Sequence, residues 1–177
     1  MERTFVMLKP DAVARGLCGK IISRFERAGL KIAAMKMLVP DKALVSKHYP
    51  YDEKWLSAVG GKTLDGYKQY GLDAEKELGT TDPAAIGRMV KGWLVDFICS
   101  GPVVAMALEG NHAVENVRKI VGNTVPTLAE AGTIRGDFSA DSPDAANKEK
   151  RPVKNLVHAS GTLEEAEFEI GLWFGED

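Results

Sequence analysis

Two stretches of the chain share one order of elements: an apolar run, an amphipathic helix and a second apolar run. The first stretch begins with "RTFVMLK" and the second with "PVVAMALEG". Short apolar runs bounded by Pro or Gly are typical of buried strands. Two such units predict an α+β, ferredoxin-like sandwich (βαββαβ), in which helices cover the faces of an antiparallel four-stranded sheet. The segments are, in chain order, 3–9, 19–29, 30–39, 102–110, 112–122 and 152–160.

The expected helices carry their own start and stop signals. Asp41 is expected to start a short helix that runs to His48. Asn111 is expected to cap a helix that Gly122 ends. The sequence "TLEE" (162–165) is that of a capping box for the last helix.

Length and charge predict one domain over residues 1–177, interrupted by two insertions. The net charge is −2, so neither a nucleic acid nor a membrane is expected as a partner, and any basic site must be local. Residues 51–92 contain many glycines and are expected to become helical at about 84–99, and "DEKWLSAV" (52–59) also reads as helix. Residues 140–152 are polar and predict a surface loop.

Cysteine usage and the amino terminus predict a cytoplasmic protein. Cys18 and Cys99 lack metal-site spacing, and no secretory leader precedes them. Reduced thiols are expected, although a single disulfide is possible. "GGKT" (60–63) resembles the end of a P-loop, but Leu56 stands where the motif requires its first glycine.

His158 lies at the end of an expected strand, three residues before an expected helix. Taken alone, such a histidine is more often a satisfied core residue, and Glu169 is as often a solvated residue as a functional one. Their neighbourhood favours a catalytic role instead, because Ser160 offers a hydroxyl and the helix start at Thr162 offers N–H groups to an anion. Glu169, about two turns into that helix, would fix the imidazole tautomer and make its other nitrogen more nucleophilic.

Cationic residues fall at strand and helix ends elsewhere in the chain. Lys9 ends a strand, Arg118 precedes a helix exit with Thr124 just beyond it, and Arg135 lies in a loop bracketed by glycines. Each alone is typical of a solvated charge. Together around one histidine they would suit a phosphoryl group in transfer, whose oxygens carry spread negative charge.

Five blocks of the sequence, in order, resemble the nucleoside diphosphate kinases. They include "FVMLKPDAVARGLCGKIISRFERAGLKIAAMKM", "SGPVVAMALEG", "VRKIVGNTVP", "GTIRGDF" and "NLVHAS…EFEIGLWF", and cover roughly two thirds of the chain. The resemblance implies ping-pong transfer of the γ-phosphate from a nucleoside triphosphate, typically ATP, to a nucleoside diphosphate through a phosphohistidine. That reaction maintains nucleoside and deoxynucleoside triphosphate pools. It also implies a homo-oligomer, whether hexamer, tetramer or dimer.

The same resemblance assigns roles to individual residues. His158 would be phosphorylated, Glu169 would orient it, and Ser160 would be hydrogen-bonded nearby. Tyr49 would lie behind the histidine and the phosphate, and Asn155 would contact the ribose, as would Lys9. Magnesium would bridge the nucleotide phosphates with few or no protein ligands. The phosphate-binding residues would be Lys9, Arg118, Thr124 and Arg135.

Three departures from the family pattern stand out. Gly161 replaces the usual aspartate and removes a carboxylate beside His158. Roughly thirty extra residues follow Tyr49, where the family's base-stacking residue lies, and about ten follow Phe138. These insertions would act as a lid, alter assembly or narrow nucleotide choice. A nucleotide-binding module without turnover and a purely structural protein remain the alternatives. The candidates for base stacking are Trp93, Met89 and Ile86.

Overall fold

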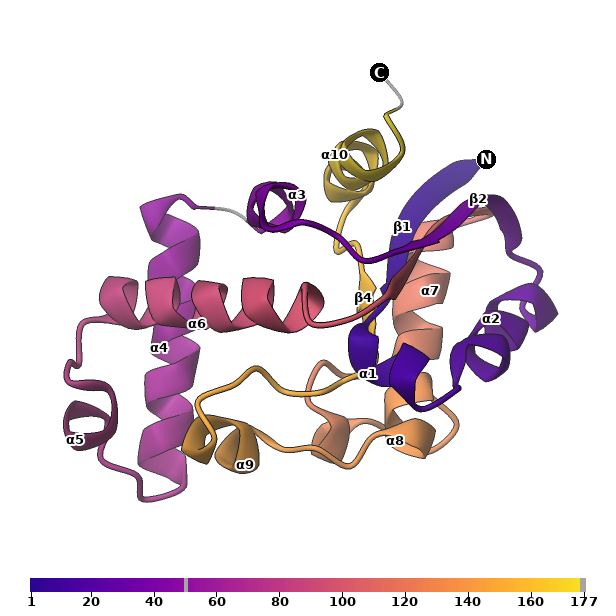
Figure 1. Cartoon of the computed structure of the whole chain (residues 1–177). Coiled ribbons are helices and arrows are strands. Elements are labelled where there is room, and N and C mark those ends of the chain that lie inside the picture. Colours follow the sequence, from indigo (N-terminus) through magenta and orange to yellow (C-terminus); the bar gives the residue numbers. More distant parts are fainter. Residues whose placement is uncertain (50, 176–177) are drawn as a thin grey trace.

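A four-stranded antiparallel sheet lies at the centre of the computed structural model, which describes residues 1–49 and 51–175 (Figure 1). The strand order is β2-β3-β1-β4, so each β-α-β unit has a strand of the other unit between its own two strands. This is the ferredoxin-like arrangement, and that prediction is confirmed. The strands are β1 (Glu2–Leu8), β2 (Lys31–Leu38), β3 (Val103–Gly110) and β4 (Val157–Ala159).

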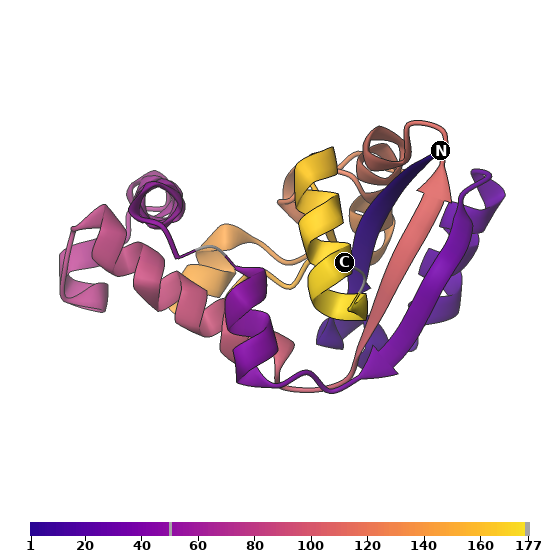
Figure 2. The same ribbon diagram turned by 90° about the horizontal axis from the view of Figure 1, so that it is seen from above.

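Helices cover both faces of the sheet (Figure 2). Alternate residues of β1 point to opposite faces, so Val6 and Leu8 pack in the core beneath α2 and α7, and Phe5 and Met7 pack against α3, α10 and the end of α6. Both faces are therefore buried, which explains why the β1 and β3 sequences are nearly continuous apolar runs. The helices are α1 (Pro10–Ala14), α2 (Cys18–Arg27), α3 (Lys42–His48), α4 (Glu53–Gln69), α5 (Ala74–Leu78), α6 (Pro83–Ile98), α7 (Ala113–Val121), the 3₁₀ helix η1 (Pro126–Leu128), α8 (Ile134–Phe138), α9 (Pro143–Lys148) and α10 (Leu163–Phe174).

Most of the helix caps predicted from the sequence are present in the structure. The Asp41 carboxylate accepts from the Leu44 N–H at 2.8 Å, and Gly122 ends α7 with a φ of 86°. Asn111 was the wrong choice of cap. The turn after β3 is tight enough to place His112 in the left-handed region (φ 48°) as the residue that precedes α7, and no side chain caps that helix.

Residues 51–92 are more helical than their glycine content predicts. The helix expected at 52–59 is present, but α4 continues through "GG" to Gln69. A Cβ on Gly60 would lie 1.8 Å from the Pro83 carbonyl oxygen, and one on Gly87 would lie 2.0 Å from the Leu56 carbonyl oxygen. These two glycines let the backbones of α4 and α6 touch where they cross, so they serve packing rather than breaking the helices.

The carboxyl-terminal third differs from prediction in two places. The expected loop at 140–152 contains the short helix α9, and the expected strand at 152–160 is only three residues long. Leu156 adopts a φ of 70°, and the Val157 N–H donates to the Asn155 carbonyl at 2.8 Å, so the chain turns just before β4. Among the described residues, no helix combines the length and apolar character needed to cross a bilayer.

Candidate active site

His158, the middle residue of β4, is held from behind by α10. Its Nε2 lies 2.7 Å from one carboxylate oxygen of Glu169, and the other oxygen accepts from the Ser160 hydroxyl at 2.6 Å. The Ser160 hydroxyl in turn accepts from the Phe5 N–H at 3.3 Å. Because β4 continues directly into α10, a strand residue and a helix residue eleven positions apart meet. The structure therefore brings together the three residues that the sequence analysis grouped.

Two residues that the sequence analysis missed complete this network. His48, the last residue of α3, packs edge-on against the His158 ring with centroids 4.5 Å apart, and its Nδ1 lies 3.5 Å from Glu169. The Trp173 indole N–H donates to that Nδ1 at 3.3 Å, so neutral His48 carries its proton on Nε2. No sequence signal could have found this contact, because His48 and His158 are far apart in the chain and share no spacing pattern.

A cavity of about 590 Å³ opens in front of His158. Lys9 at the end of β1 donates to the Asn155 side-chain oxygen at 2.7 Å, and the Asn155 amide donates to the Thr124 carbonyl at 2.8 Å. Glu169 and Ser160 are not among the lining residues and lie behind the imidazole. The predicted site residues that line the cavity are Lys9, Tyr49, Arg118, Thr124, Arg135, Asn155 and His158.

Arg135 lies in the short helix α8 and not in the expected loop, because the Thr133 hydroxyl caps that helix by accepting from the Gly136 N–H. Its guanidinium donates to the backbone carbonyls of Asn155, Gly122 and Val157 at 3.1, 2.9 and 2.6 Å. A guanidinium has about five N–H groups, so roughly two remain for a ligand. The side chain thus ties the chain before β4 to the end of α7 and presents positive charge to the cavity.

Burial and mutual repulsion set the protonation states of the site. Burial lowers the pKa of Lys9 to about 8, and Arg135 adds to the shift. Burial also lowers the pKa of His158 to about 3, with a further contribution from Lys9 and an opposing one from Glu165. The imidazole is therefore neutral near pH 7. With its Nε2–H donated to Glu169, the lone pair resides on Nδ1.

The carboxylate lost at Gly161 has a nearby replacement. The Glu165 carboxylate accepts from the Gly161 N–H at 2.7 Å, and a Cβ on Gly161 would lie 2.9 Å from that same oxygen. The Thr162 hydroxyl accepts from the Glu165 N–H at 3.2 Å, so the capping box is present with its return bond shifted by one residue. Glu165 fills the space that a side chain at position 161 would occupy.

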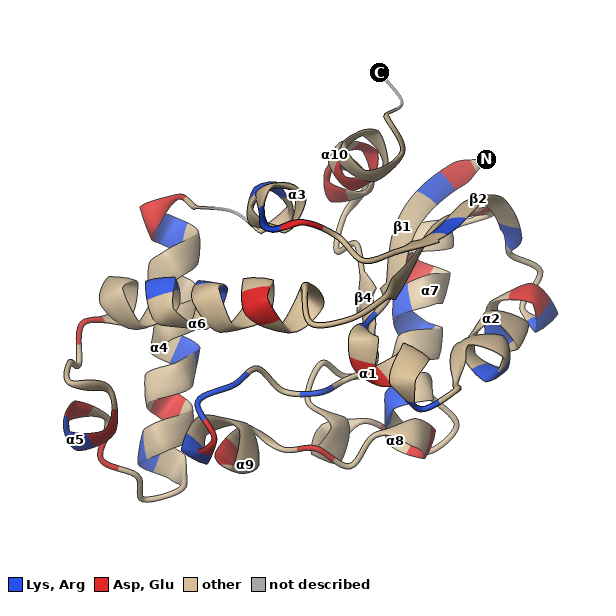
Figure 3. Cartoon of the chain, in the orientation of Figure 1, with Lys and Arg blue, Asp and Glu red and all other residues tan. Residues whose placement is uncertain are grey.

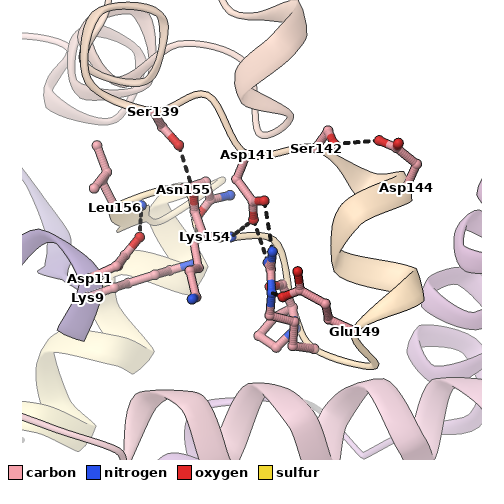
Figure 4. A network of polar contacts seen from close by, with 12 residues as sticks. Lys9, Asp11, Ser139, Asp141, Ser142, Asp144, Glu149, Lys154, Asn155 and Leu156 are labelled. Atoms are coloured by element: carbon pink, nitrogen blue, oxygen red, sulfur yellow. Dashed lines mark hydrogen bonds and ion pairs between the residues drawn. The ribbon is translucent and has the colours of Figure 1, made fainter.

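Helices α4 and α6 and the segment around α9 build the remaining walls of the cavity. Helix α4, helix α6 and residues 143–153 all contribute lining residues. Asp141 anchors the last segment, because it accepts from Arg151 at 2.6 Å and from the Lys154 N–H at 2.7 Å. Figure 4 shows Asp141 and Lys154 within this network. Of the three candidates for base stacking, Trp93 lines the cavity, whereas Met89 and Ile86 do not.

The donor set gives little support for a metal held by the protein alone. Ligand atoms of His48, His158 and Glu169 lie within 4.8 Å of one another. Glu169, however, is already hydrogen-bonded to His158 Nε2, and His48 Nδ1 lies 3.5 Å from the same carboxylate. These contacts orient the His158 imidazole. The part of the chain that the structure describes contributes no carboxylate to the cavity wall. A divalent cation in the cavity would need ligands from the bound molecule.

A neutral, carboxylate-oriented imidazole facing lysine and arginine side chains is the arrangement of a phosphotransferase, because it offers a nucleophile and several fixed cations to one phosphoryl group. The ferredoxin-like sheet brings Lys9 close to His158, because Leu8 of β1 pairs with Val157 of β4.

The chain belongs to the nucleoside diphosphate kinase family, whose model matches residues 2–55 and 87–177. The nucleoside diphosphate kinase of Pyrobaculum aerophilum is 54% identical over 177 residues, covering 100% of this chain and 97% of that relative. A crystal structure of an NDP kinase from the same organism superimposes with a TM-score of 0.96 at 53% identity, covering 98% of this chain and 95% of that one. A nucleoside-diphosphate kinase from Borrelia burgdorferi, described as a transition state mimic with bound vanadate and ADP, gives a TM-score of 0.77 at 38% identity and covers 98% and 86%.

Family membership makes the chain an enzyme of nucleotide metabolism that transfers phosphoryl groups between nucleotides. Apart from Met1, the family model leaves residues 56–86 unmatched, which comprise most of α4, all of α5 and the start of α6. The enzyme therefore carries a common catalytic fold with a helical addition next to the cavity.

Proposed function

We propose that His158 takes the γ-phosphate of a nucleoside triphosphate on Nδ1 and passes it to a nucleoside diphosphate. As the Nδ1–phosphorus bond forms, the bond from phosphorus to the β,γ-bridging oxygen breaks, and that oxygen leaves with the diphosphate. The imidazole becomes cationic while Nε2–H stays hydrogen-bonded to Glu169. The reverse sequence on the second nucleotide completes a ping-pong cycle. The 2.7 Å contact between Nε2 and Glu169 carries this proposal, because it leaves Nδ1 as the free nitrogen.

The cations that line the cavity hold the phosphates. Lys9, Arg118 and Arg135 neutralise the equatorial oxygens of the transferring group, and Thr124 contributes a hydroxyl beside them. Asn155, already bonded to Lys9, is placed to contact the ribose. Tyr49 lines the cavity near the imidazole and closes it on the side of α3. Ser160 keeps Glu169 in place.

Magnesium is proposed to enter with the nucleotide. The cavity wall, as far as the structure describes it, offers cations and neutral groups, so phosphate oxygens and water are the natural ligands of the metal ion. When bound, the ion supplies charge neutralisation between the phosphates. The protein's own contribution is to hold the outer oxygens and to orient His158.

The whole chain is proposed to act as one nucleoside diphosphate kinase domain in the cytoplasm, with insertions at about 51–92 and 140–152. A homo-oligomer is proposed as well. Strand β2 is the edge of the sheet and exposes 53% of Met35 and 60% of Met37. An unprotected edge strand with apolar side chains is a ready surface for pairing with a second copy.

Labelling with ATP that carries an isotope on its γ-phosphate tests the transfer. The expected label is stable in base and labile in acid, and it disappears when GDP is added. His158→Ala should take up no label while still binding ADP. A wild-type protein without label, or a His158→Ala protein with full label, would contradict the proposal.

A further inference from the structure

Helix α3 presents two residues of the candidate site at its carboxyl end. His48 Nδ1 lies 3.5 Å from the Glu169 carboxylate, and the His48 ring packs edge-on against the His158 ring. Tyr49, the next residue, lines the cavity. The helix spans only seven residues, and so short a helix is not stable by itself. Contacts with neighbouring elements must therefore set where these side chains lie.

Lys91 of α6 holds the carboxyl end of α3. Its ammonium donates to the backbone carbonyls of Ser46 and Tyr49 at 3.1 and 2.9 Å. Carbonyls at the end of a helix lack partners within that helix, and a lysine side chain is a favourable partner there. Ser46 precedes His48 by two residues and Tyr49 follows it, so bonds to both carbonyls fix the backbone that bears the His48 ring.

The environment of Lys91 is an unusual one for a lysine. The residue is only 8% exposed, and burial lowers the pKa of its ammonium. The ammonium also lies over the Tyr51 ring, 4.7 Å from the ring centroid. A buried ammonium costs free energy unless hydrogen bonds compensate for the lost water, whereas an apolar side chain would fill the same space without that cost. The bonds to the α3 carbonyls therefore explain why a lysine occupies this position.

We propose that Lys91 is a positioning residue for phosphoryl transfer and acts through His48, a proposal that rests on the transfer through His158 proposed above. Lys91 is not among the residues that line the cavity, so it reaches neither the phosphates nor the base. By fixing the end of α3, it holds the His48 ring against the imidazole and beside the Glu169 carboxylate. A misplacement of about 1 Å at a reacting group costs on the order of 10²-fold in rate, so this remote contact bears on turnover.

Lys91→Met tests the proposal, because it removes the ammonium and keeps a side chain of similar length. Phosphorylation by ATP, followed by rapid mixing, should slow by roughly 10-fold or more. The affinity for ADP, measured by calorimetry, should stay close to that of wild type, which also shows that the variant is folded. Lys91→Gln, polar but shorter by one bond, should show a similar loss, and Lys91→Arg, which keeps N–H donors, should recover most of the rate.

Helix α6 also provides a matched control, since it bears side chains of both charges (Figure 3). At the amino end of α3, Lys42 donates to the Asp96 carboxylate of α6 at 2.6 Å, and both side chains are exposed. Lys42→Met removes a link between the same two helices at the end away from His48. It should leave the phosphorylation rate unchanged, because an exposed ion pair contributes little to stability.

A double-mutant comparison separates positioning from a general loosening of the fold. His48→Phe keeps a flat ring but removes the nitrogen beside Glu169. Adding Lys91→Met to His48→Phe should slow phosphorylation by less than about 2-fold, because both changes interrupt one chain of contacts. Nitrogen NMR of the unphosphorylated protein gives a readout that needs no turnover. Lys91→Met should shift the ring signals of His158, and Lys42→Met should not.

Five results would overturn the positioning role. They are a wild-type rate in Lys91→Met, unchanged His158 ring signals in that variant, and a rate loss of the same size when His48 is already replaced. An ADP affinity that falls as much as the rate would make Lys91 a support of the cavity wall, and an equal loss in Lys42→Met would reduce its effect to the general docking of α3. Failure of the proposed transfer looks different, because wild type then forms no phosphoenzyme while the ring signals still report on Lys91.

Discussion

At the scale of single residues, the proposed chemistry depends on a hydrogen-bonded chain behind His158 rather than on His158 alone. Glu169 contacts His158 and Ser160, and it is buried, which raises the pKa of its carboxyl. A buried carboxylate stays ionised only where such partners compensate for the lost water. His48 also lies next to the Glu169 carboxylate, and the Trp173 indole N–H donates to His48.

Replacing Glu169 tests that chain. Glu169→Gln keeps the shape but removes the charge that stabilises the cationic imidazole, so phosphorylation should slow by roughly 10²-fold while ADP affinity stays nearly the same. Rapid-mixing measurements of phosphoenzyme formation give the rate, and Glu167→Gln, exposed on the same helix, is the matched control. A large loss of ADP affinity in Glu169→Gln would contradict an orienting role.

The protonation state of Lys9 predicts a pH dependence of binding. Its pKa in the folded protein is lowered to about 8, so the ammonium is present below that pH and is lost as the pH rises through it. Affinity for ADP should therefore fall above about pH 8, and binding there should take up a proton. Calorimetry in buffers of different ionisation enthalpy measures that uptake. Lys9→Arg, which stays charged, should show neither effect, and an unchanged pH profile in wild type would exclude the role of Lys9.

At the scale of elements, local signals in the sequence predicted the helix ends better than the extent of the inserted helices. Asp41 and Thr162 were identified as caps because their bonds are made within one turn. The helix expected at 52–59 continues to Gln69, and this continuation could not be predicted from composition, since Gly60 is explained only by the approach of α6, which is a tertiary contact. Likewise the turn just before β4 could not be predicted, since Leu156 adopts a φ of 70° where Arg135 of α8 donates to the carbonyls of Asn155 and Val157.

Gly60 and Gly61 of α4 allow a matched test of whether α4 and α6 are close-packed where they cross. Gly60→Ala would drive a methyl group into the Pro83 carbonyl and should destabilise the protein by about 1–3 kcal/mol. Gly61→Ala, one residue along the same helix, has open space around its added Cβ and should stabilise α4 by up to about 1 kcal/mol. Urea unfolding of the two variants provides the comparison. Equal effects on the free energy of unfolding would mean that the α4–α6 crossing is not close-packed.

The amino-terminal cap of α10 makes a further test at this scale. Thr162→Ala removes the acceptor of the Glu165 N–H and should lower the free energy of unfolding by about 1 kcal/mol. Thr162→Ser keeps a hydroxyl and should restore most of that loss. Thermal unfolding of both variants gives the answer, and an unaffected Thr162→Ala protein would mean that another group satisfies this N–H.

At the scale of the whole molecule, two chain segments far apart in sequence enclose the cavity. The residue types of the candidate site and the ferredoxin-like fold were predictable, because they follow from β-α-β periodicity and from motifs at strand ends. The closure of the cavity by α4 and α9 was not, since it depends on Tyr67 meeting Asn147 across the molecule. The same limit applied to His48, which reaches His158 only after the sheet and helices are assembled.

The exposed edge of the sheet yields a prediction about assembly. Met37→Lys places a charge on the β2 edge and should disfavour pairing with a second copy, so the mass in solution should fall. Light scattering coupled to size-exclusion chromatography measures it. Met89→Lys, also exposed but on α6, is the control. An unchanged oligomer in Met37→Lys would place the subunit interface on another surface.

The identity of the phosphorylated nitrogen is the most direct test of the proposed transfer through His158. NMR of the phosphoenzyme, prepared with isotope-labelled histidine, reports which ring nitrogen of His158 is coupled to phosphorus. Because Nε2 is bonded to Glu169, we expect phosphorus on Nδ1 and a proton retained on Nε2. Phosphorus on Nε2, or on any residue other than His158, would contradict it.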